Sequence, residues 1–500
     1  VHFNGSINAI TTTIVLTDAS QFPSSGTSYV QIGSEEISYT GKSGNTLTGV
    51  TRGVRNTTAA SHTSGDSVTN SSDYIAWGEA ASGDFVVDPG LWSIDNFGDN
   101  VIALIHNSSC FEWNSNALNE VQNRATVIAG APTASREMLV STPDRHLVFF
   151  GTETTIGDPT TQDDMFIRFS NQEDINTYDP TAVNTAGTQR LSDGSRIVGA
   201  VRGRNAIYVW TDTALFTMRF VGAPFTFAFE QVGTNCGLIG ESAAIEVDGA
   251  AYWMSDNGFF RYSGNLESMV CLVEDYVFDD LNTTANQLIT AGLNNLFGEI
   301  TWFYCTAGST IVNRCVTYNY AESSPQRPVW TTGSLARTTW VDSAVFGKPH
   351  GTAYDSTGTS YDVIGNTDGS TTYYQHETGT DQVRAGATTA VASNIQSGDF
   401  DISAQEGLAG SGEYMMKIRR FIPDFLSQTG NTQITLNLRD YPNQSQASSA
   451  LGPFTISSST TKVDTRARAR LVALKVANTS TSQDWKLGGF RLDIQPDGRR

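Results

Sequence analysis

The sequence predicts an all-β protein with a β-propeller body, and three observations support that fold class. Aromatic runs are joined by tight turns, most clearly in residues 251–262, where two aromatic strands flank an Asp-Asn-Gly turn that tolerates positive φ. The 500 residues include 46 Gly and 10% aromatic residues, and small polar residues interrupt almost every apolar run. A sustained helical period of about 3.6 residues is nearly absent. Stacked antiparallel sheets therefore fit the chain better than helices do.

The length and the changes in pattern divide the chain into three expected parts. We expect residues 1–70 to form a small added β module, residues 71–395 the propeller body, and residues 396–500 a C-terminal β-sandwich-like region. In the first part, short strands alternate with turns every ~8–10 residues. Its expected strands are 12–16, 29–32, 36–39 and 45–50, and its exit linker is expected at 57–65 and 69–72. Alternatively, this block is the first blade of the body.

Repeated hairpins predict the blades of the body. Besides 251–262, hairpins are predicted at 207–218 and at 361–375, with Gly369 in the turn of the latter. Further candidate blade strands are 91–93 with 101–105, 146–150 with 165–169, 300–304 and 316–320. Their irregular spacing suits blades of about four strands with unequal loops.

Two features of the body are more specific. Trp210 and Trp253 each lie in an aromatic run before a tight turn, so we expect them on inner strands of separate blades. Residues 266–281 and 285–295 are the candidate helices, and both are expected to be connectors between sheets.

The C-terminal part contains one strong charge pattern. Apolar and alternating runs at 415–422, 433–438, 454–456, 471–476 and 485–494 predict a β-sandwich. Within it, Arg466, Arg468 and Arg470 alternate with alanines, which at a period of two places them on one strand face. They are the candidate subunit-interface residues, because guanidinium groups suit carboxylates of a neighbouring subunit. A solvated strand face and direct phosphate contact are the alternatives.

The charge is distributed unevenly along the chain. The net charge is −20, from 31 basic and 51 acidic residues. Residues 401–500 contain 13 basic and 9 acidic residues, a net charge of +4, which leaves 18 and 42, or −24, for residues 1–400. An acidic bulk serves solubility, or it repels another polyanion, whereas a stable nucleic-acid binder would be basic.

No catalytic, cofactor-binding or metal-binding residues are predicted. The sequence lacks nucleophile-elbow, zinc-protease, phosphate-loop, dinucleotide and calcium-loop motifs. The histidines at 2, 62, 106, 146, 350 and 376 are isolated, which favours structural roles over general-base roles. Adjacent acids at 163–164, 173–174 and 279–280 offer a glycosidase reading. Adjacent residues of a strand point to opposite faces, however, so we do not favour it.

The cysteines and the apolar runs bear on the cellular compartment. Five cysteines, at 110, 236, 271, 305 and 315, include no C-x-x-C pair, so no zinc site is expected. Cys305 and Cys315 are placed to face each other across a hairpin, but free, buried thiols in a reducing cytosol are the favoured reading. No run of 18 apolar residues and no signal peptide in residues 1–30 are found, so neither membrane insertion nor classical secretion is expected.

Eight runs of the sequence resemble a known family. They are 140–146, 168–174, 184–187, 209–213, 233–240, 251–262, 275–282 and 493–500. These runs look like structural tail proteins of short-tailed bacteriophages, and the closest role within that family is the tail nozzle, also called the hub or stabilisation protein. The resemblance covers residues 75–500, and the first 70 residues look like an added module.

The resemblance implies a virion protein without catalytic residues or cofactors. It implies a homohexameric tube below the portal and adaptor rings, assembled in the host cytoplasm, through which double-stranded DNA passes transiently along an acidic lumen. The implied partners are other copies of the chain, the adaptor ring, and tail fibre, tailspike or needle proteins. A receptor-binding tail protein and a tail-borne polysaccharide depolymerase are the alternative functions.

Overall fold

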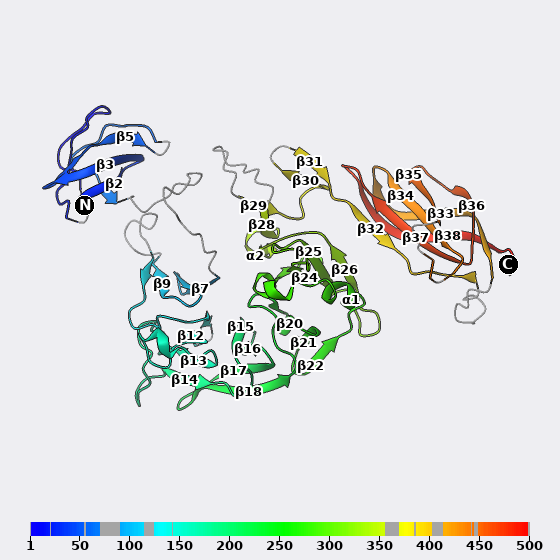
Figure 1. Cartoon of the computed structure of the whole chain (residues 1–500), viewed down its shortest axis with the longest axis horizontal. Coiled ribbons are helices and arrows are strands. Elements are labelled where there is room, and N and C mark those ends of the chain that lie inside the picture. The colour runs from blue at the N-terminus through cyan, green and yellow to red at the C-terminus, as the bar shows by residue number, and fades with distance from the viewer. Residues whose placement is uncertain are drawn as a thin grey trace. The chain divides into compact units, whose positions relative to one another are not determined.

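The computed structural model describes residues 2–498 apart from 21, 55–56, 71–90, 115–124, 143, 356–369, 385–386, 403–413, 442 and 445–448. Strands dominate this part of the chain, the sheets are antiparallel and the helices are short, so the all-β prediction is confirmed. The chain divides into two compact units, Val1–His376 and Glu377–Arg500. Figure 1 shows the elements of both units, coloured along the chain.

The first unit begins with a six-stranded sheet that has its own apolar core. Its strands are β1 (Ile14–Val15), β2 (Ser25–Ile32), β3 (Glu35–Ser43), β4 (Thr46–Thr48), β5 (Thr51–Val54) and β6 (Val68–Asn70). They lie in the order β1-β4-β3-β2-β6, with β5 paired to β3. Val30 and Ile32 are two residues apart on β2, so both side chains point into this core.

Residues 57–65 belong to this sheet module, which corrects the predicted exit linker. The backbone N–H of Ala60 and the imidazole of His62 both contact the Glu35 carboxylate on β3. The segment therefore folds back onto the sheet instead of leaving it. Of the second predicted linker segment, residues 69–70 lie in β6 and residues 71–72 are outside the described residues.

Six further sheets follow in the first unit. The first sheet consists of β7 (Trp92–Phe97), β8 (Asn100–Ile105), β9 (Cys110–Trp113) and β10 (Thr126–Val127). The second consists of β11 (Glu137–Ser141), β12 (His146–Phe150), β13 (Phe166–Phe169) and β14 (Gly187–Arg190). The third consists of β15 (Ile197–Arg202), β16 (Ile207–Thr211), β17 (Ala214–Gly222) and β18 (Thr226–Thr234). The fourth sheet consists of β19 (Ala244–Val247), β20 (Ala250–Ser255), β21 (Gly258–Tyr262) and β22 (Leu266–Met269). The fifth consists of β23 (Thr290–Asn294), β24 (Glu299–Tyr304), β25 (Arg314–Asn319) and β26 (Trp330–Gly333). The sixth consists of β27 (Thr339–Val341), β28 (His350–Asp355) and β29 (Ser370–Gln375). The helical segments between them are η1 (Pro159–Thr161), α1 (Glu274–Phe278), η2 (Thr283–Leu288) and α2 (Ser343–Phe346).

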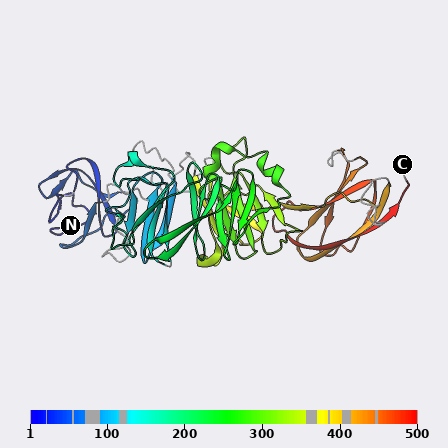
Figure 2. The ribbon, with the colours of Figure 1, turned by 90° about the horizontal axis from the view of Figure 1, so that it is seen from below.

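These six sheets are the blades of a β-propeller. Each sheet pairs its strands in chain order, and the first strands of successive sheets pack against one another, β7 on β11, β11 on β15, β15 on β19, β19 on β23 and β23 on β27. The first strands therefore form the inner edge, and later strands lie farther out (Figure 1). Seen edge-on, the blades stand side by side (Figure 2). The predicted propeller body is confirmed.

Buried tryptophans recur at one position of the blades. Trp210, Trp253 and Trp302 are each the fourth residue of the second strand, in the third, fourth and fifth blades. Trp210 and Trp253 thus lie in separate blades, as predicted, but on the second strand and not the innermost one. Their rings meet edge-to-face with centroids 5.3 Å apart, so the two blades pack through them.

Two of the predicted hairpins are confirmed, whereas most residues of the two predicted helices are not helical. The hairpins at 207–218 and 251–262 are confirmed, whereas of 361–375 only 370–375 lies within the described residues. Only Glu274–Phe278 of residues 266–281 is α-helical, and residues 285–295 contain the end of η2 and strand β23. Pairing with neighbouring strands overrides the weak local helical pattern in both segments.

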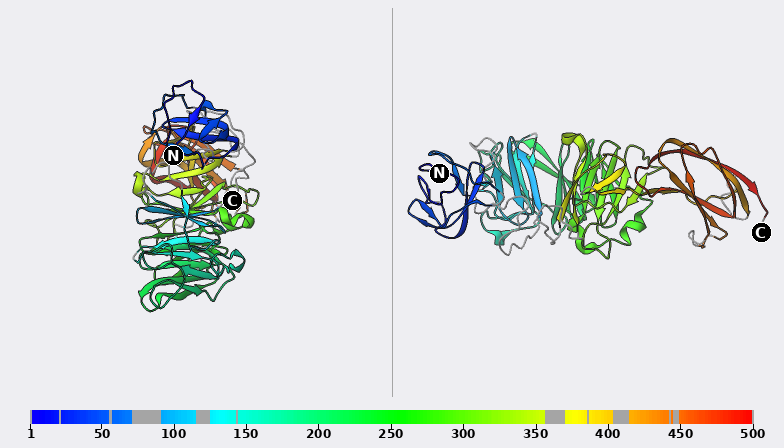
Figure 3. Two further views of the ribbon diagram at one scale, coloured as in Figure 1. Left: turned by 90° about the vertical axis from the view of Figure 1, so that its left-hand side faces the viewer. Right: turned by 90° about the horizontal axis from the view of Figure 1, so that it is seen from above.

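The second unit is a β-sandwich preceded by a hairpin. The hairpin is β30 (Asp381–Arg384) with β31 (Ala387–Ala390), and the sandwich strands are β32 (Ser393–Gln396), β33 (Met416–Thr429), β34 (Thr432–Arg439), β35 (Ala450–Ile456), β36 (Val463–Ala469), β37 (Leu471–Asn478) and β38 (Asp484–Pro496). One sheet has the order β32-β37-β34-β35 and the other β36-β33-β38, and Figure 3 shows them as two layers. Ile418, Phe421, Ile434 and Val476 fill the space between the sheets. The predicted sandwich is confirmed, but residues 377–395 group with it and not with the propeller body.

Candidate functional site

Polar side chains tie the inner edges of the first three blades together. Asp95 on β7 accepts a hydrogen bond from the backbone N–H of Val140 on β11 at 2.8 Å. Asp95 also pairs with Arg202 at the end of β15. The Asp95 side chain is only 17% exposed, so this ion pair is better shielded from solvent than a surface pair.

A second polar link joins the first blade to the fourth. His106, directly after β8, places Nδ1 2.9 Å from Oε1 of Glu241, shortly before β19. Nearby, Glu137 at the start of β11 accepts a hydrogen bond from the backbone N–H of Ala200 at 2.7 Å. Burial raises the pKa of the Glu137 carboxyl, and the neighbouring Glu241 raises it further. Contacts between blades that are not neighbours cross the space inside the ring, so protein side chains bridge the propeller centre.

Asp144, His146 and Thr185 form an arrangement that resembles a catalytic triad. His146 Nδ1 lies 2.5 Å from Asp144 Oδ2, and its Nε2 lies 3.0 Å from Thr185 Oγ1. A carboxylate, an imidazole and a hydroxyl in this order can activate a nucleophile. However, His146 has no exposed surface, and the rings of Phe169 and Phe227 pack against it. A substrate has no access to this imidazole, so the cluster is structural.

The adjacent acids at 163–164 are held by separate arginines. Asp163 Oδ2 lies 2.6 Å from Arg190 Nε, and Asp164 Oδ2 lies 2.6 Å from Arg136 Nη2. A retaining or inverting glycosidase needs two carboxyl groups that face one sugar bond. Because each carboxylate is already neutralised by its own guanidinium group, this pair does not provide such a site.

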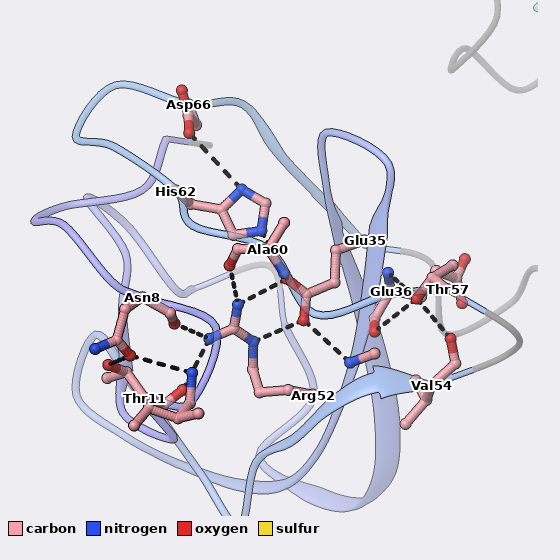
Figure 4. A network of polar contacts seen from close by, with 12 residues as sticks. Asn8, Thr11, Glu35, Glu36, Arg52, Val54, Thr57, Ala60, His62 and Asp66 are labelled. Carbon is pink, nitrogen blue, oxygen red and sulfur yellow. Dashed lines mark hydrogen bonds and ion pairs between the residues drawn. The ribbon is translucent and has the colours of Figure 1, made fainter.

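The N-terminal module buries the carboxylate of Glu35 among hydrogen-bond donors (Figure 4). Arg52 donates from Nε and Nη2 at 2.7 Å each, the backbone N–H groups of Gly53 and Ala60 donate at 3.0 and 2.9 Å, and His62 Nε2 lies at 2.8 Å. Burial raises the pKa of Glu35, but the bonds from Arg52, Ala60 and His62 outweigh it and lower the pKa to about 2. Every partner is provided by the chain itself, so this network is structural.

The cysteines are free thiols, as predicted. Cys110, Cys236, Cys305 and Cys315 are buried, and Cys271 is half-buried. Burial raises the pKa of Cys110 to about 12 and the pKa values of Cys236 and Cys271 to about 11. The thiols are therefore protonated at neutral pH and unreactive.

The described residues contain neither a candidate metal centre nor a helix that could span a membrane. No group of three His, Cys, Asp or Glu side chains there could hold a metal ion. None of the helices described is long and apolar enough to cross a membrane.

The predicted arginine pattern lies on the second unit. Arg466 and Arg468 are exposed on β36, whereas Ala467 and Ala469 between and after them are buried, so the shared face is confirmed for these two arginines. Arg470 follows the end of β36. Arg468 Nε bonds Asp497 Oδ2 of the same chain at 2.5 Å. A role of the three arginines at a subunit interface stays a prediction.

Comparisons with known proteins give no family. No protein-family model and no curated protein matches the sequence. Among solved structures, dihydro-heme d1 dehydrogenase NirN is similar over 68% of this chain and 63% of its own, at 10% identity and a TM-score of 0.32. The extracellular domain of a putative one-component system from B. thetaiotaomicron is similar over 70% and 51%, at 12% identity and a TM-score of 0.29. A lignostilbene dioxygenase from Pseudomonas brassicacearum is similar over 75% and 89%, at 7% identity and a TM-score of 0.30. Likeness at this level carries no argument about function.

Proposed function

We propose that this chain is a structural subunit of the tail nozzle of a short-tailed bacteriophage. Six copies form a tube below the portal and adaptor rings, and DNA leaves the capsid through it. The observation that carries this proposal is the position, in the fold, of the sequence runs that resemble phage tail proteins. Residues 140–146 and 251–262 are blade hairpins, and 493–500 includes the end of β38. The resemblance thus extends over both units.

The links across the propeller centre bear on the path of the DNA. The Asp95–Arg202 and His106–Glu241 contacts join the first blade to the third and fourth. A duplex cannot pass through a centre that these side chains bridge. The proposed lumen therefore lies between copies, and each propeller is a block in its wall.

Exposed apolar side chains on the first and last blades support self-assembly. Trp92 and Ile94 on β7 are 57% and 65% exposed, and Val341 on β27 and Tyr373 on β29 are 50% and 62% exposed. Large exposed apolar side chains are typical of surfaces that contact another protein. In the proposed tail, the partners are other copies of the chain, the adaptor ring, and fibre, tailspike or needle proteins.

Assembled tails are expected to contain six copies of the chain in a closed ring, because a conduit on the tail axis needs cyclic symmetry. Native mass spectrometry of purified tails measures the copy number, and averaged particle images locate the ring. Three copies at the tip of a fibre would favour the receptor-binding alternative. Release of reducing sugar from host envelope glycan would favour the depolymerase alternative.

Lysine substitutions at acidic positions of the lumen are expected to slow DNA ejection without blocking assembly. Residues 1–400 have a net charge of −24, and an acidic wall gives DNA no adhesive phosphate contacts. Each added lysine creates such a contact, which salt weakens by screening. The ejection rate is measured against salt concentration, with lysine substitutions on the outer wall as the control. Equal rates in both sets of variants would contradict the role of the acidic wall and leave the conduit in place.

A further inference from the structure

The outer face of the β36-β33-β38 sheet has more cations than carboxylates. Lys417 and Arg419 on β33, Arg466 and Arg468 on β36, and Arg491 on β38 are exposed, and together we call these five the basic face. Asp464 and Asp493 lie on the same side of the sheet, where both pair with Arg420. The opposite face of the same sheet is apolar and packs on the other sheet of the sandwich. Charge is therefore concentrated on one side of one sheet.

The strand register places like charges against each other on this face. Lys417 lies directly opposite Arg468 on one side and Gln495 on the other. Like charges in directly opposed positions destabilise an antiparallel pair unless an anion relieves them. The Asp497 carboxylate neutralises the charge of Arg468, because its Oδ2 lies 2.5 Å from Arg468 Nε. The other four members of the basic face form no ion pair with any described residue, so anionic groups from outside the unit fit this surface.

The propeller has an acidic surface at one end of its third and fourth blades. In a four-stranded meander, the turn between the second and third strands and the connection to the next blade emerge at the same end. Asp212 and Asp256 lie in two such turns, and Glu274, Asp275 and Asp279 lie in and directly after α1, in the connection to the fifth blade. We call these five residues the acidic rim.

The members of the acidic rim lie close together although they come from three segments. A Cβ atom on Gly258, next to the turn that contains Asp256, would lie 3.6 Å from Glu274 Oε1. Burial raises the pKa of the Asp256 carboxyl, Arg196 opposes that rise, and the nearby charge of Asp212 adds to it. Asp212, Asp256 and Glu274 therefore lie near one another at this end of the blades, with the cation Arg196 beside Asp256.

Both surfaces also expose apolar side chains. Leu272 and Tyr276, beside the acidic rim, are 71% and 47% exposed, and Ile422 and Leu426 on β33 are 38% and 81% exposed. Protein interfaces combine an apolar centre with complementary charges that select the partner and the register. The two surfaces are complementary in charge and similar in their apolar content.

We propose that the basic face of one copy docks on the acidic rim of a second copy of this chain. Because the two surfaces differ and lie on different units, each copy presents one of each and the contact is head-to-tail. Its repetition closes into a ring when the rotation from copy to copy divides a full turn, which is the geometry that the proposed function requires. This inference rests on the self-assembly that the proposed function requires, and it names the contact that holds the ring.

Charge reversal on each surface tests the contact. The first variant combines Arg466→Glu, Arg468→Glu and Arg491→Glu, and the second combines Asp256→Lys, Asp275→Lys and Asp279→Lys. Each variant alone is expected to assemble about 100-fold more weakly than the parent, because opposed like charges replace attractive pairs. An equimolar mixture is expected to recover assembly, since each variant presents the surface that the other needs. The ring then alternates the two variants, and six copies allow alternation to close.

Two controls separate folding and net charge from docking. Arg204→Glu, Arg219→Glu and Arg327→Glu together change the net charge as much as the first variant does, but on the propeller, and are expected to leave assembly unchanged. The milder triple Arg466→Gln, Arg468→Gln and Arg470→Gln is expected to weaken assembly with an unchanged thermal unfolding midpoint. Sedimentation velocity measures assembly, and circular dichroism measures folding.

The other outcomes each overturn the inference in a recognisable way. Assembly of both single variants at the parent's strength would show that the ring uses other surfaces, and the proposed nozzle would stand. A second outcome is that the mixture does not assemble, whereas a single chain that carries all six reversals does. That result would show that the two surfaces contact each other within one chain. Tight binding of a DNA duplex probe by the parent, lost in the first variant, would make the basic face a phosphate site. Absence of any ring in the parent would instead remove the proposed function itself.

Discussion

Replacing Glu35 by Ala is expected to unfold the N-terminal sheet while the propeller and the sandwich stay folded. The substitution leaves the Arg52 guanidinium, which is 6% exposed, without its buried carboxylate. Breaking a buried ion pair by removing one partner costs about 3–5 kcal/mol, a large share of the stability of a module of this size. Hydrogen exchange followed by mass spectrometry on the whole chain measures the effect, as faster exchange in β2, β3 and β5.

Two variants of the same network control for this result. Asp66→Asn is expected to change exchange little, because Asp66 is 39% exposed and its Oδ2 lies 3.8 Å from His62 Nδ1. Glu35→Gln keeps the shape of the side chain but points an N–H group at donors, so it is expected to be nearly as damaging as Ala. Parent-like exchange in both Glu35 variants would show that the network contributes nothing to the module.

The same carboxylate gives the module a pH dependence with a defined sign. The pKa of Glu35 is lowered from 4.5 to about 2 in the folded chain. A lowered folded-state pKa contributes stability above the unfolded pKa, and that stability is lost as the pH falls through the folded pKa. The N-terminal sheet is therefore expected to lose protection between about pH 4.5 and pH 2, and the Glu35→Gln variant to lack that part of the dependence. Hydrogen exchange on parent and variant across this range checks the difference.

Local patterns predicted the hairpins and the arginine face because each depends on residues that are adjacent in sequence. The Asp256-Asn257 turn between two aromatic runs needs only its own sequence to form, and it became the turn between β20 and β21. Arg466 and Arg468 share a face because a strand repeats every two residues. Neither argument requires knowledge of the rest of the fold.

Contacts between residues that are far apart in the sequence could not be predicted from local sequence patterns. Arg52 and His62 are 17 and 27 residues from Glu35, and no spacing rule connects them. The same sequence reading assigned residues 57–65 to a linker, because small polar residues look like a linker whether or not their backbone N–H groups bind a buried carboxylate. The acidic rim was missed for a similar reason, since its members become neighbours only when the blades pack.

Replacing Trp302 by Ala is expected to be among the most damaging single substitutions in the propeller. Trp302 is fully buried, its ring lies 4.9 Å from the ring of Phe259 in the fourth blade, and its Nε1–H donates to the backbone oxygen of Ala243 at 2.9 Å. The substitution removes the apolar contact between two blades, leaves a cavity and removes one of the two hydrogen bonds to that carbonyl, which keeps the bond from the backbone N–H of Met254. Such a change in a packed core costs about 3–5 kcal/mol. Hydrogen exchange of β23 to β26 measures the cost as a lower free energy of local opening.

Trp302→Phe separates the two contributions of the side chain. Phe keeps most of the apolar contact but has no donor for the Ala243 oxygen, which still accepts from the Met254 N–H, so a loss of about 0.5–1.5 kcal/mol is expected. Trp92→Ala is the matched control, because Trp92 is 57% exposed on β7 and its loss is expected to change the opening free energy by less than about 0.5 kcal/mol. If the Ala and Phe variants of Trp302 lose the same free energy, the hydrogen bond and not the packing joins the fourth and fifth blades. If neither variant opens more easily than the parent, the blades are held together elsewhere, and the wall proposed for the tube does not depend on these tryptophans.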